Sequence, residues 1–274
     1  MSKENQKVWL VTGTSKGLGL HLIKLLLSQG HKVIATSRNT DALEKEITSF
    51  KENLFPVKLD ITSDTAVKKA IDESIEKLGR IDVVVNNAGM HSRGDLSTVD
   101  PSEVAAMVDI NLRAPMVLSC AAIPFLQRAG SGAIVMVGSL AGRAPLQGAV
   151  TYSGTKAGLR AFAYGLSDEL RDANINVGVV SPGPIDTGFI MDEIDQVEDI
   201  VFSQPMSSAS AVAEAVLAIA AGQQIEISMP AFSGKLTTLS YLFPSLRRGL
   251  RSKLYEMGRK NKDKYRNRAA QLSD

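Results

Sequence analysis

The stretch "VWLVTGTSKGLG", residues 8–19, decides the fold of this 274-residue chain. A β-branched, apolar run is followed by glycines at 13, 17 and 19, and then by the helical apolar pattern "LGLHLIKLLL". This order is typical of a buried strand, a tight turn and a helix. Glycines in such a turn let backbone N–H groups and the helix N-terminus approach a pyrophosphate. The turn therefore predicts a dinucleotide site, although its G-x-x-x-G-x-G spacing is not G-x-G-x-x-G, and an ordinary tight turn is the alternative.

The same strand-then-helix order continues along the chain. Six further strand candidates follow: "KVIATSR" from Lys32, "FPVKLD" from Phe55, "DVVVNNAG" from Asp82, "GAIVMVGS" from Gly132, "NVGVVSPG" from Asn176 and "QIEISMP" from Gln224. Several are nearly continuous in Val and Ile, as in parallel strands covered on both faces. Helix-length segments separate them, one of which opens at Ser63 and closes at Gly79. The pattern predicts an α/β fold with a doubly wound, parallel, seven-stranded sheet and helices on both faces.

The charge of the chain is balanced overall and uneven locally. The formal net charge is +2, which excludes a nucleic-acid polycation. The segment from Arg247 to Arg268 carries ten Lys or Arg against Glu256 and Asp263, a local balance of +8. The sequence therefore predicts no nucleic-acid partner for the body of the chain and a basic C-terminal end.

Few residues suggest redox, metal or membrane chemistry. The single Cys120 lies in an apolar pattern and is expected in the core. The three histidines are scattered, so no metal site is predicted. The N-terminal segment is polar and enters a strand at once, without a signal-peptide pattern, and no uninterrupted apolar run reaches about 18 residues. A cytoplasmic protein without a transmembrane helix is the expectation.

The end of the second strand discriminates between cofactors. An Asp or Glu there usually binds the ribose 2′-hydroxyl of NAD. The sequence instead reads "ATSRN", with Arg38, while Lys16 stands inside the glycine turn. Two cations suit a 2′-phosphate, so NADP(H) is the predicted cofactor, and solvated surface charges are the alternative.

Several motifs occur in one order. They are "TGTSKGLG", Leu59–Asp60, "NNAG" at 86–89, Asn111, Ser139, "YSGTK" at 152–156 and "SPGPIDT" at 181–187. With them the chain resembles the short-chain dehydrogenases/reductases of the single-domain type over about residues 7–230. The resemblance implies a Rossmann-type fold and hydride transfer between a nicotinamide cofactor and a carbonyl or alcohol.

The resemblance assigns four catalytic residues. Tyr152 would be the general acid for carbonyl reduction and the base for alcohol oxidation. Lys156 would lower the pKa of that tyrosine and bind the nicotinamide ribose, and Ser139 would hold the carbonyl oxygen. Asn111 would support a proton-relay water; alternatively, it satisfies a backbone group in a helix kink before Pro115.

The resemblance also assigns the cofactor contacts. Asp60 would bind the adenine edge, although it could instead cap the helix that follows. Ile185 and Thr187 would contact the carboxamide. The remaining predicted contacts are Gly13, Ser15, Lys16, Gly17, Leu18, Gly19, Arg38, Ile61, Asn87, Ala88, Gly89, Tyr152, Lys156, Pro182 and Gly183.

Elementary physics agrees with the "YSGTK" assignment. Residues i and i+4 share a helix face, so Lys156 lies one turn beyond Tyr152. A free tyrosine titrates near pKa ~10, and a nearby ammonium favours the phenolate. Ser139 follows a predicted strand at the sheet edge where open α/β folds bind ligands. Two hydroxyls there can stabilise the charge that develops on one oxygen.

The substrate is less defined by the sequence. Residues 185–203, here called the lid, are expected to cover it. Six acids lie between Asp186 and Asp199; they either discourage anionic substrates or face solvent. Arg93 and Arg143 point toward the opposite preference. Because "SLAGRAPLQG" is otherwise apolar, a lipophilic ketone or aldehyde is the predicted substrate.

The C-terminal end departs from the compact family pattern. Residues 1–242 are predicted to form the NADP(H)-binding domain and residues 243–274 a basic amphipathic extension. Its apolar stripe consists of Leu246, Leu250, Leu254, Met257 and Tyr265. Three alternatives stay open: docking on the enzyme's own acidic surface beside the substrate mouth, peripheral contact with an anionic membrane, or a solvated tail. A homo-oligomer, dimer or tetramer, is expected, with the extension arguing against the common tetramer.

Together these patterns predict an NADP(H)-dependent oxidoreductase that interconverts a carbonyl and an alcohol. A catalytically silent NADP(H)-binding sensor or scaffold is the alternative, and a membrane or nucleic-acid binder acting through the tail is a third. An eroded tyrosine or lysine would favour the silent protein, and both residues are present.

Overall fold

The seven predicted strands form a single parallel sheet. The computed structural model describes residues 6–273, with side chains as far as residue 267. The strands are β1 (Val8–Thr12), β2 (Lys32–Ser37), β3 (Leu54–Lys58), β4 (Val83–Asn86), β5 (Gly132–Val137), β6 (Ile175–Pro182) and β7 (Glu226–Met229). Their order in the sheet is β3-β2-β1-β4-β5-β6-β7. The order reverses between β1 and β4, the position at which open α/β sheets leave a ligand crevice. The predicted fold class is confirmed.

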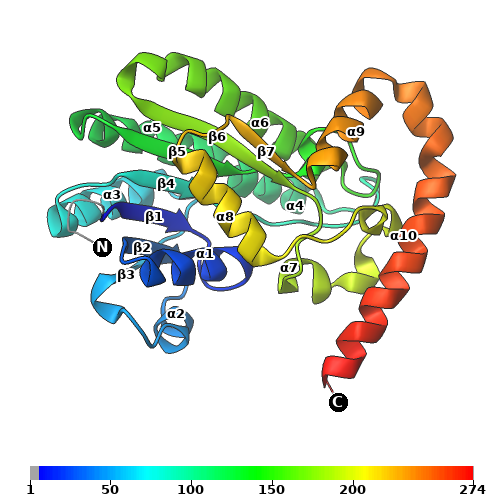
Figure 1. Ribbon diagram of the computed structural model, residues 1–274, viewed down its shortest axis with the longest axis horizontal. Coiled ribbons are helices and arrows are strands. Elements are labelled where there is room, and N and C mark those ends of the chain that lie inside the picture. The colour runs from blue at the N-terminus through cyan, green and yellow to red at the C-terminus, as the bar shows by residue number, and fades with distance from the viewer. Residues whose placement is uncertain (1–5, 274) are drawn as a thin grey trace.

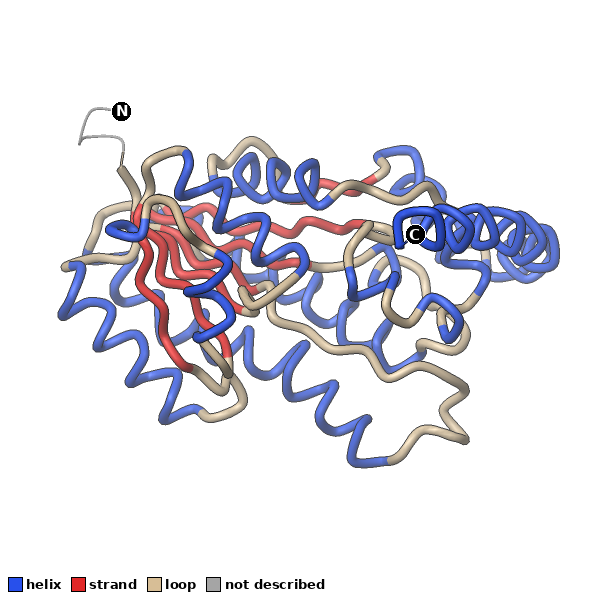
Figure 2. Tube along the Cα trace, turned by 90° about the horizontal axis from the view of Figure 1, so that it is seen from below, coloured by secondary structure: helices blue, strands red, loops and turns tan. Residues whose placement is uncertain are grey.

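Helices cover both faces of the sheet (Figures 1 and 2). One face carries α1 (Gly17–Ser28), α2 (Asp41–Glu46) and α8 (Ala209–Ala220). The other carries α3 (Asp64–Leu78), α5 (Ala114–Arg128) and α6 (Val150–Glu169), with α4 (Pro101–Val108) leading into α5. Alternate side chains of β1 separate the two cores, because successive strand residues point to opposite faces. Trp9 and Val11 face α1, whereas Leu10 packs with α3 and α5.

Capping residues fix the ends of α3 as the sequence predicts. The Ser63 hydroxyl accepts a hydrogen bond from the backbone N–H of Ala66 at 3.3 Å. The helix ends at Gly79, which has a φ of +78° and so takes the left-handed conformation that favours glycine. These caps start and stop α3 between β3 and β4, which keeps the crossover short.

One helical stretch within the described residues is long and apolar enough to cross a membrane. It runs from Pro101 to Arg128 through α4 and α5. Leu118, Ala122 and Leu126 on its inner side are buried in the core against the sheet, so the stretch has the pattern of a core helix. Cys120, expected in the core, is exposed, because it lies on the outer side of α5.

The C-terminal part of the chain lies beyond the carboxyl ends of the strands (Figure 1). The lid contains α7 (Gly188–Met191) and two 3₁₀ turns, Ile194–Gln196 and Asp199–Ser203. After β7, α9 (Ala231–Leu242) rises away from the sheet, and α10 (Pro244–Ser273) returns along the lid. The predicted extension is therefore helical, and its boundary at residue 242 falls between α9 and α10.

Candidate active site

The turn after β1 and the loop after β4 are held together by a short polar network. The Thr12 hydroxyl accepts hydrogen bonds from the backbone N–H groups of Asn87 and Ala88, each at 3.0 Å. The Asn87 side-chain amide donates to the carbonyl oxygens of Thr12 at 2.8 Å and Gly13 at 3.0 Å. The "NNAG" motif thereby fixes the glycine turn at the crevice where the strand order reverses.

Two glycines are required at this junction. Gly13 has a φ of +69°, and a Cβ on it would lie 2.8 Å from Ala88 Cα. A Cβ on Gly19 would lie 2.2 Å from the carbonyl oxygen of Gly13. Any side chain at either position would push the turn, α1 and the β4 loop apart.

The first turn of α1 offers backbone donors to the crevice. Its first N–H groups have no intrahelical partners, as at every helix start, and the N-cap residue Lys16 provides no side-chain cap. Gly17, Leu18 and Gly19 line a cavity of about 920 Å³. An uncapped helix N-terminus facing a cavity of this size fits a dinucleotide pyrophosphate.

The predicted 2′-phosphate cations lie at one end of the same cavity. Lys16, Arg38 and Asp60 all line it, and both cations are exposed. Lys16 lies 3.9 Å from Asp192, a largely solvated pair. Hydrogen bonds from Thr62 hold the pKa of Asp60 below its usual value, with a smaller contribution from the charge of Arg38. Asp60 does not cap α3, because Ser63 does so.

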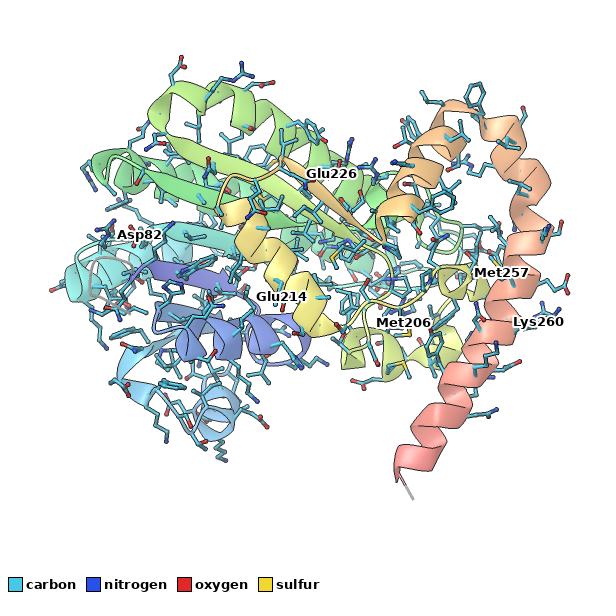
Figure 3. The ribbon with its side chains drawn as sticks, viewed as in Figure 1. Asp82, Met206, Glu214, Glu226, Met257 and Lys260 are labelled. Atoms are coloured by element: carbon cyan, nitrogen blue, oxygen red, sulfur yellow. The ribbon has the colours of Figure 1, made fainter. Side chains whose placement is uncertain are left out.

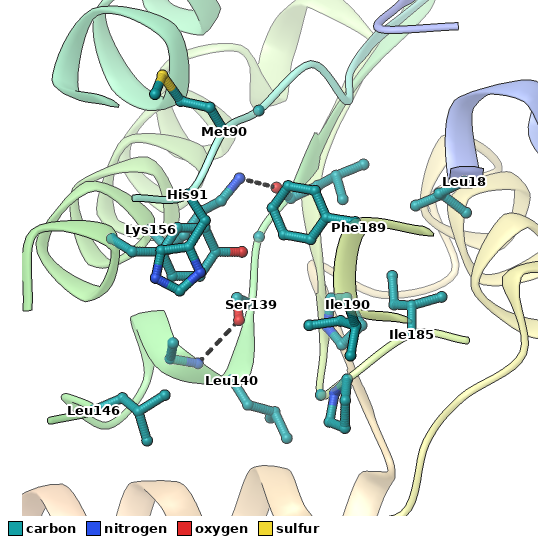
Figure 4. A pocket seen from close by; sticks show the side chains of 18 of the residues that line it. Leu18, Met90, His91, Ser139, Leu140, Leu146, Lys156, Ile185, Phe189 and Ile190 are labelled. Carbon is teal, nitrogen blue, oxygen red and sulfur yellow. Dashed lines mark hydrogen bonds between the residues drawn. The ribbon is translucent and has the colours of Figure 1, made fainter. Parts of the chain in front are cut away.

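Three of the four predicted catalytic residues, Ser139, Tyr152 and Lys156, line the middle of the cavity, and Figure 4 labels Ser139 and Lys156. Ser139 follows β5, and its hydroxyl accepts from the backbone N–H of Ala141 at 3.1 Å. Tyr152 lies on the first turn of α6, and Lys156 one turn later. The buried Lys156 Nζ donates to the carbonyl oxygen of Val137 at 2.9 Å and lies 5.7 Å from the centroid of the Tyr152 ring.

The surroundings of Tyr152 act on its pKa in both directions. Burial raises the pKa of Tyr152, while the Ser139 hydroxyl and the charge of Arg93 act in the lowering direction. Burial also lowers the pKa of Lys156 to about 8. Burial therefore favours the protonated phenol, and the expected effect of Lys156 on the pKa of Tyr152 stays a prediction.

Asn111 lies behind the cavity and not on its wall. It is fully buried in a π-helical turn, Asp109–Arg113, that joins α4 to α5. Its side-chain oxygen accepts from the Met90 N–H at 2.9 Å, and its amide donates to the Met90 carbonyl at 2.8 Å. The alternative that Asn111 serves a backbone is therefore what the structure shows, although the backbone belongs to the β4 loop. Its role in a proton relay stays a prediction.

His91 is a neighbour of Tyr152 that the sequence motifs did not predict. The His91 ring stacks on the Tyr152 ring with centroids 4.3 Å apart and an interplanar angle of 18° (Figure 4). Burial, followed by the charges of Arg93 and Lys156, lowers the pKa of His91 to about 3. Arg93 Nη1 lies 2.9 Å from His91 Nδ1, and since a guanidinium only donates, Nδ1 accepts. The neutral ring then carries its proton on Nε2.

Arg93 and Arg143 are both occupied by acids of the protein. Arg93, whose side chain is 7% exposed, pairs with Glu193 of the lid at 2.9 Å and donates to the Phe189 carbonyl at 2.9 Å. Arg143 pairs with Glu226 on β7 (labelled in Figure 3). Neither arginine is left over to bind an anionic substrate.

The end of the cavity between the lid, α9 and α10 is mostly apolar, although Gln204, Thr237 and Arg247 also line it. Its walls come from the β5 loop, the lid, α9 and α10; the lining side chains include Leu140, Ala144, Leu146, Phe189, Ile190, Leu236, Leu239, Leu246, Leu250 and Leu254. Figure 4 shows Ser139, Leu140 and Leu146 across the cavity from Ile185, Phe189 and Ile190 of the lid. All predicted site residues except Asn111 line this one cavity.

The basic extension docks on the acidic lid. The buried Lys262 Nζ donates to the carbonyl oxygen of Val197 at 2.7 Å and lies 3.3 Å from the Asp199 carboxylate. Asn261 donates to the Phe202 carbonyl at 3.0 Å. Of the three alternatives for the extension, docking on the enzyme's own acidic surface is the one that the structure shows for this part of α10.

The lid acids are mostly paired. Asp192 lies near Lys16, Glu193 pairs with Arg93, Asp195 with Arg266 and Asp199 with Arg259, and Glu198 accepts from the Tyr255 hydroxyl at 3.1 Å. The alternative that these acids face solvent holds for four of the six, since Asp186, Asp192, Glu193 and Asp195 are exposed, whereas Glu198 and Asp199 are partly buried under α10. Their charges hold the lid in place and do not line an anion-repelling wall.

Comparison with known proteins agrees with this geometry. The family model described as short chain dehydrogenase matches residues 7–198. The oxidoreductase BOA17 of Botryotinia fuckeliana is 38% identical over 182 residues, which span 66% of either chain. A short-chain dehydrogenase structure from Streptomyces avermitilis has a TM-score of 0.78 at 26% identity and covers 92% of this chain and 97% of its own. ElxO, solved with NADP bound, has a TM-score of 0.76 at 26% identity and covers 83% of this chain and 99% of its own.

The matched segment contains the glycine turn, the β4 loop and the Ser139–Tyr152–Lys156 group described above. The family model thus covers the glycine turn and the middle of the cavity, whereas β7, α9 and α10 lie beyond the matched residues. The chain belongs to the short-chain dehydrogenase/reductase family and is an oxidoreductase of that family.

Proposed function

We propose that the protein is an NADP(H)-dependent carbonyl reductase, or alcohol dehydrogenase in the reverse direction, for a lipophilic substrate. The observation that carries the proposal is one continuous cavity. At one end it has the uncapped start of α1 with two cations, in the middle Ser139, Tyr152 and Lys156, and at the other end an apolar wall. A dinucleotide and a carbonyl compound are the two ligands that such a cavity would hold side by side.

In the proposed reaction, the cofactor would supply the hydride, and the side chains of the protein would supply the proton and the hydrogen bonds. A bound reduced nicotinamide would supply the hydride to the carbonyl carbon. The Tyr152 hydroxyl, kept protonated by burial, donates its proton to the carbonyl oxygen. The Ser139 hydroxyl donates a hydrogen bond to the same oxygen as negative charge develops there. The Lys156 ammonium would hold the ribose and, with the positive oxidised nicotinamide, favour the tyrosinate left after proton transfer.

The choice of NADP(H) rests on the polar end of the cavity. Arg38 and Lys16 line it, and the carboxylate that accompanies them, Asp60, is turned toward Thr62. The solved NADP complex of ElxO supports the same choice. Two exposed cations favour a 2′-phosphate over a free 2′-hydroxyl.

The substrate class rests on the apolar end. Arg93 and Arg143 are paired with Glu193 and Glu226, which leaves Arg247 as a cation in the cavity lining at this end. Aliphatic side chains from the lid, α9 and α10 complete the wall. A medium-sized ketone or aldehyde with an aliphatic or aromatic body would bury its apolar surface there, at about 25 cal/mol per Å².

A panel of ketones and aldehydes of increasing chain length, read by NADPH consumption, tests the proposal. Turnover should rise with apolar size, and Tyr152→Phe should abolish most of it. NADPH binding without turnover of any carbonyl would contradict the proposal and favour the silent binding protein.

A further inference from the structure

An exposed apolar and basic surface surrounds the mouth of the cavity. It is formed by α9 and the first turns of α10, residues 231–255, here called the entrance hairpin (Figure 1). Of the fourteen exposed large hydrophobic side chains among the described residues, eight belong to it. They are Phe232, Leu236, Leu239, Tyr241, Leu242, Phe243, Leu246 and Leu250. A surface with this concentration of apolar side chains marks an interaction site.

The charge of the entrance hairpin has one sign. Lys235, Arg247, Arg248, Arg251 and Lys253 lie within it, and it contains no Asp or Glu. The cations farther along α10 differ, because Arg259, Lys262 and Arg266 are paired with acids of the lid. Four of the hairpin cations, Lys235, Arg248, Arg251 and Lys253, are exposed beside the apolar groups, whereas Arg247 is partly buried and lines the cavity.

The hairpin is continuous with the cavity. Leu236, Leu239, Leu246 and Leu250 are exposed and also line the cavity wall. The root of α9 is fixed to the active site, since Arg143 donates to the Gly234 carbonyl at 3.1 Å and to the Thr238 hydroxyl at 2.7 Å. Whatever covers the hairpin consequently lies against the entrance to the catalytic cavity.

We propose that the entrance hairpin docks on an anionic membrane surface and places the cavity mouth at the lipid interface. Apolar side chains such as Phe232, Leu242 and Phe243, which are 70%, 65% and 55% exposed, would enter the headgroup region. The four exposed cations would face anionic headgroups, each adding to the attraction. A lipophilic carbonyl could then pass from the bilayer into the cavity; this last step alone rests on the proposed function.

A second copy of the chain is the less suitable occupant. A two-fold dimer brings the same patch of both subunits together, so the four exposed cations of one hairpin would face those of the other, and the hairpin contains no acid to place between them. An anionic lipid surface satisfies the apolar groups and the cations at once. The proposed membrane-binding surface is thus the entrance hairpin, which includes α9 and the start of α10, whereas the distal part of α10 binds the lid.

Vesicle sedimentation of the full chain tests the proposal. The protein should sediment with phosphatidylcholine vesicles that contain phosphatidylserine, and far less with phosphatidylcholine alone. The triple variant Phe232→Ser, Leu242→Ser, Phe243→Ser should weaken partitioning by about tenfold or more, since none of these side chains lines the cavity. Phe50→Ser, which removes an exposed aromatic side chain elsewhere, is the matched control.

The charge is tested separately. Arg248→Glu with Lys253→Glu should weaken partitioning by roughly 30-fold or more, because each lost cation removes about 1 kcal/mol and the two added acids are repelled by the anionic surface. Lys51→Glu with Lys58→Glu changes the net charge equally near β3 and should leave partitioning unchanged. Equal sedimentation of the native protein and the apolar triple variant would overturn the proposal, as would no sedimentation with anionic vesicles.

Two further readouts separate the alternatives. In sedimentation velocity without lipid, the native protein and the apolar triple variant should have the same oligomeric state. If the native protein associates and the triple variant does not, the hairpin binds a second copy of the chain, and membrane docking is overturned. The triple variant should keep the native kcat for a water-soluble ketone and show a higher KM for a ketone held in vesicles. Vesicle binding by a chain that reduces no carbonyl would leave the docking proposal intact while the proposed function fails.

Discussion

Tyr152 is the acid of the proposed reaction, and its surroundings favour the protonated phenol. Burial raises the pKa of the phenol, and the neutral His91 ring stacked on it adds no positive charge. The Lys156 ammonium, one turn farther along α6, donates to the Val137 carbonyl. In the proposed function, the protonated phenol is the form that donates to a carbonyl oxygen.

Tyr152→Phe tests the acid directly. The variant should retain NADPH binding and lose about a hundredfold or more in kcat, the usual scale for a general acid. Fluorescence titration with NADPH and steady-state kinetics measure the two effects. Ser139→Ala, which removes a donor and not the acid, is the companion variant, and a Tyr152→Phe enzyme with near-native kcat would refute the assignment.

The lowered pKa of Lys156 predicts a pH dependence. Its pKa is about 8, so the ammonium is present below that pH and is lost above it, while Tyr152 stays protonated. Carbonyl reduction, measured as kcat/KM for NADPH, should therefore fall as pH rises through about 8, because this parameter reports the free enzyme. The arginine of Lys156→Arg stays charged at all these pH values. If this variant is active, its kcat/KM for NADPH should fall only at a higher pH than that of the native protein. A flat profile from neutral to strongly alkaline pH would contradict this prediction.

The position of Arg38 at the cavity predicts that the protein prefers NADPH to NADH. Arg38→Asp should lower the affinity for NADPH by about 1.5–3 kcal/mol and shift preference toward NADH, because a charge-assisted contact is lost and a carboxylate repels the phosphate. Arg38→Gln separates the lost cation from the added acid. Equal affinity of the native protein for the two reduced cofactors, measured by calorimetry, would show that Arg38 does not bind the 2′-phosphate.

At the scale of elements, the sequence motifs predict which residues line the cavity, because the parallel sheet brings the segments after its strands to one edge. Parallel strands place their carboxyl ends at one edge, so the turn after β1, the loop after β4, Ser139 after β5 and the segment after β6 must meet there. The partner of α10 has no such constraint. Its contacts join Lys262 to Asp199 and Tyr265 to Phe202, residues distant in sequence that a periodicity argument cannot pair.

Close approach of α10 to the lid depends on one glycine. A Cβ at Gly258 would lie 1.9 Å from the Asp199 carbonyl oxygen, a backbone atom, whereas nothing lies within 4 Å of a Cβ at Gly249. Gly258→Ala should cost docking of α10 about 1–3 kcal/mol, expose the lid to proteolysis and raise KM for lipophilic substrates. Gly249→Ala gains the same helix propensity in the same helix and is the control. Equal KM and equal proteolysis in the two variants would mean that α10 does not hold the lid.

At the scale of the whole molecule, local sequence patterns predict the sheet and its covering helices but not the contacts of α10. Strand and helix alternation predicts the sheet, its two covered faces and seven strands, since each follows from local hydrophobic patterns. The sequence does not predict that the apolar face of α10 contacts two different surfaces. Leu246 and Leu250 line the cavity and stay partly exposed, whereas Tyr265 packs against Phe202 of the lid. The same helix serves two surfaces, which a single amphipathic pattern does not reveal.

Removal of α10 tests how far the molecule is modular. The two large core clusters draw on the strands and on α1, α3, α5, α6 and α8, and on no residue of α10. A chain stopped after Leu242 should therefore fold, bind NADPH as the full chain does and keep most of its thermal stability. The lid should lose its hold, because Lys262, Arg259 and Arg266 no longer pair with its acids, and the cavity should lose Leu246, Leu250 and Leu254.

The expected result is a higher KM for lipophilic carbonyls, with a smaller change for a short, water-soluble one. High salt should produce part of this effect in the full chain, because it screens the exposed Arg259 and Arg266 pairs, with a Debye length of about 3 Å at 1 M, more than it screens the buried Lys262. Calorimetry, NADPH titration and kinetics on both chains measure these quantities. Loss of cooperative unfolding in the truncated chain would show that α10 belongs to the folding unit, and an unchanged KM would show that the lid holds its position without it.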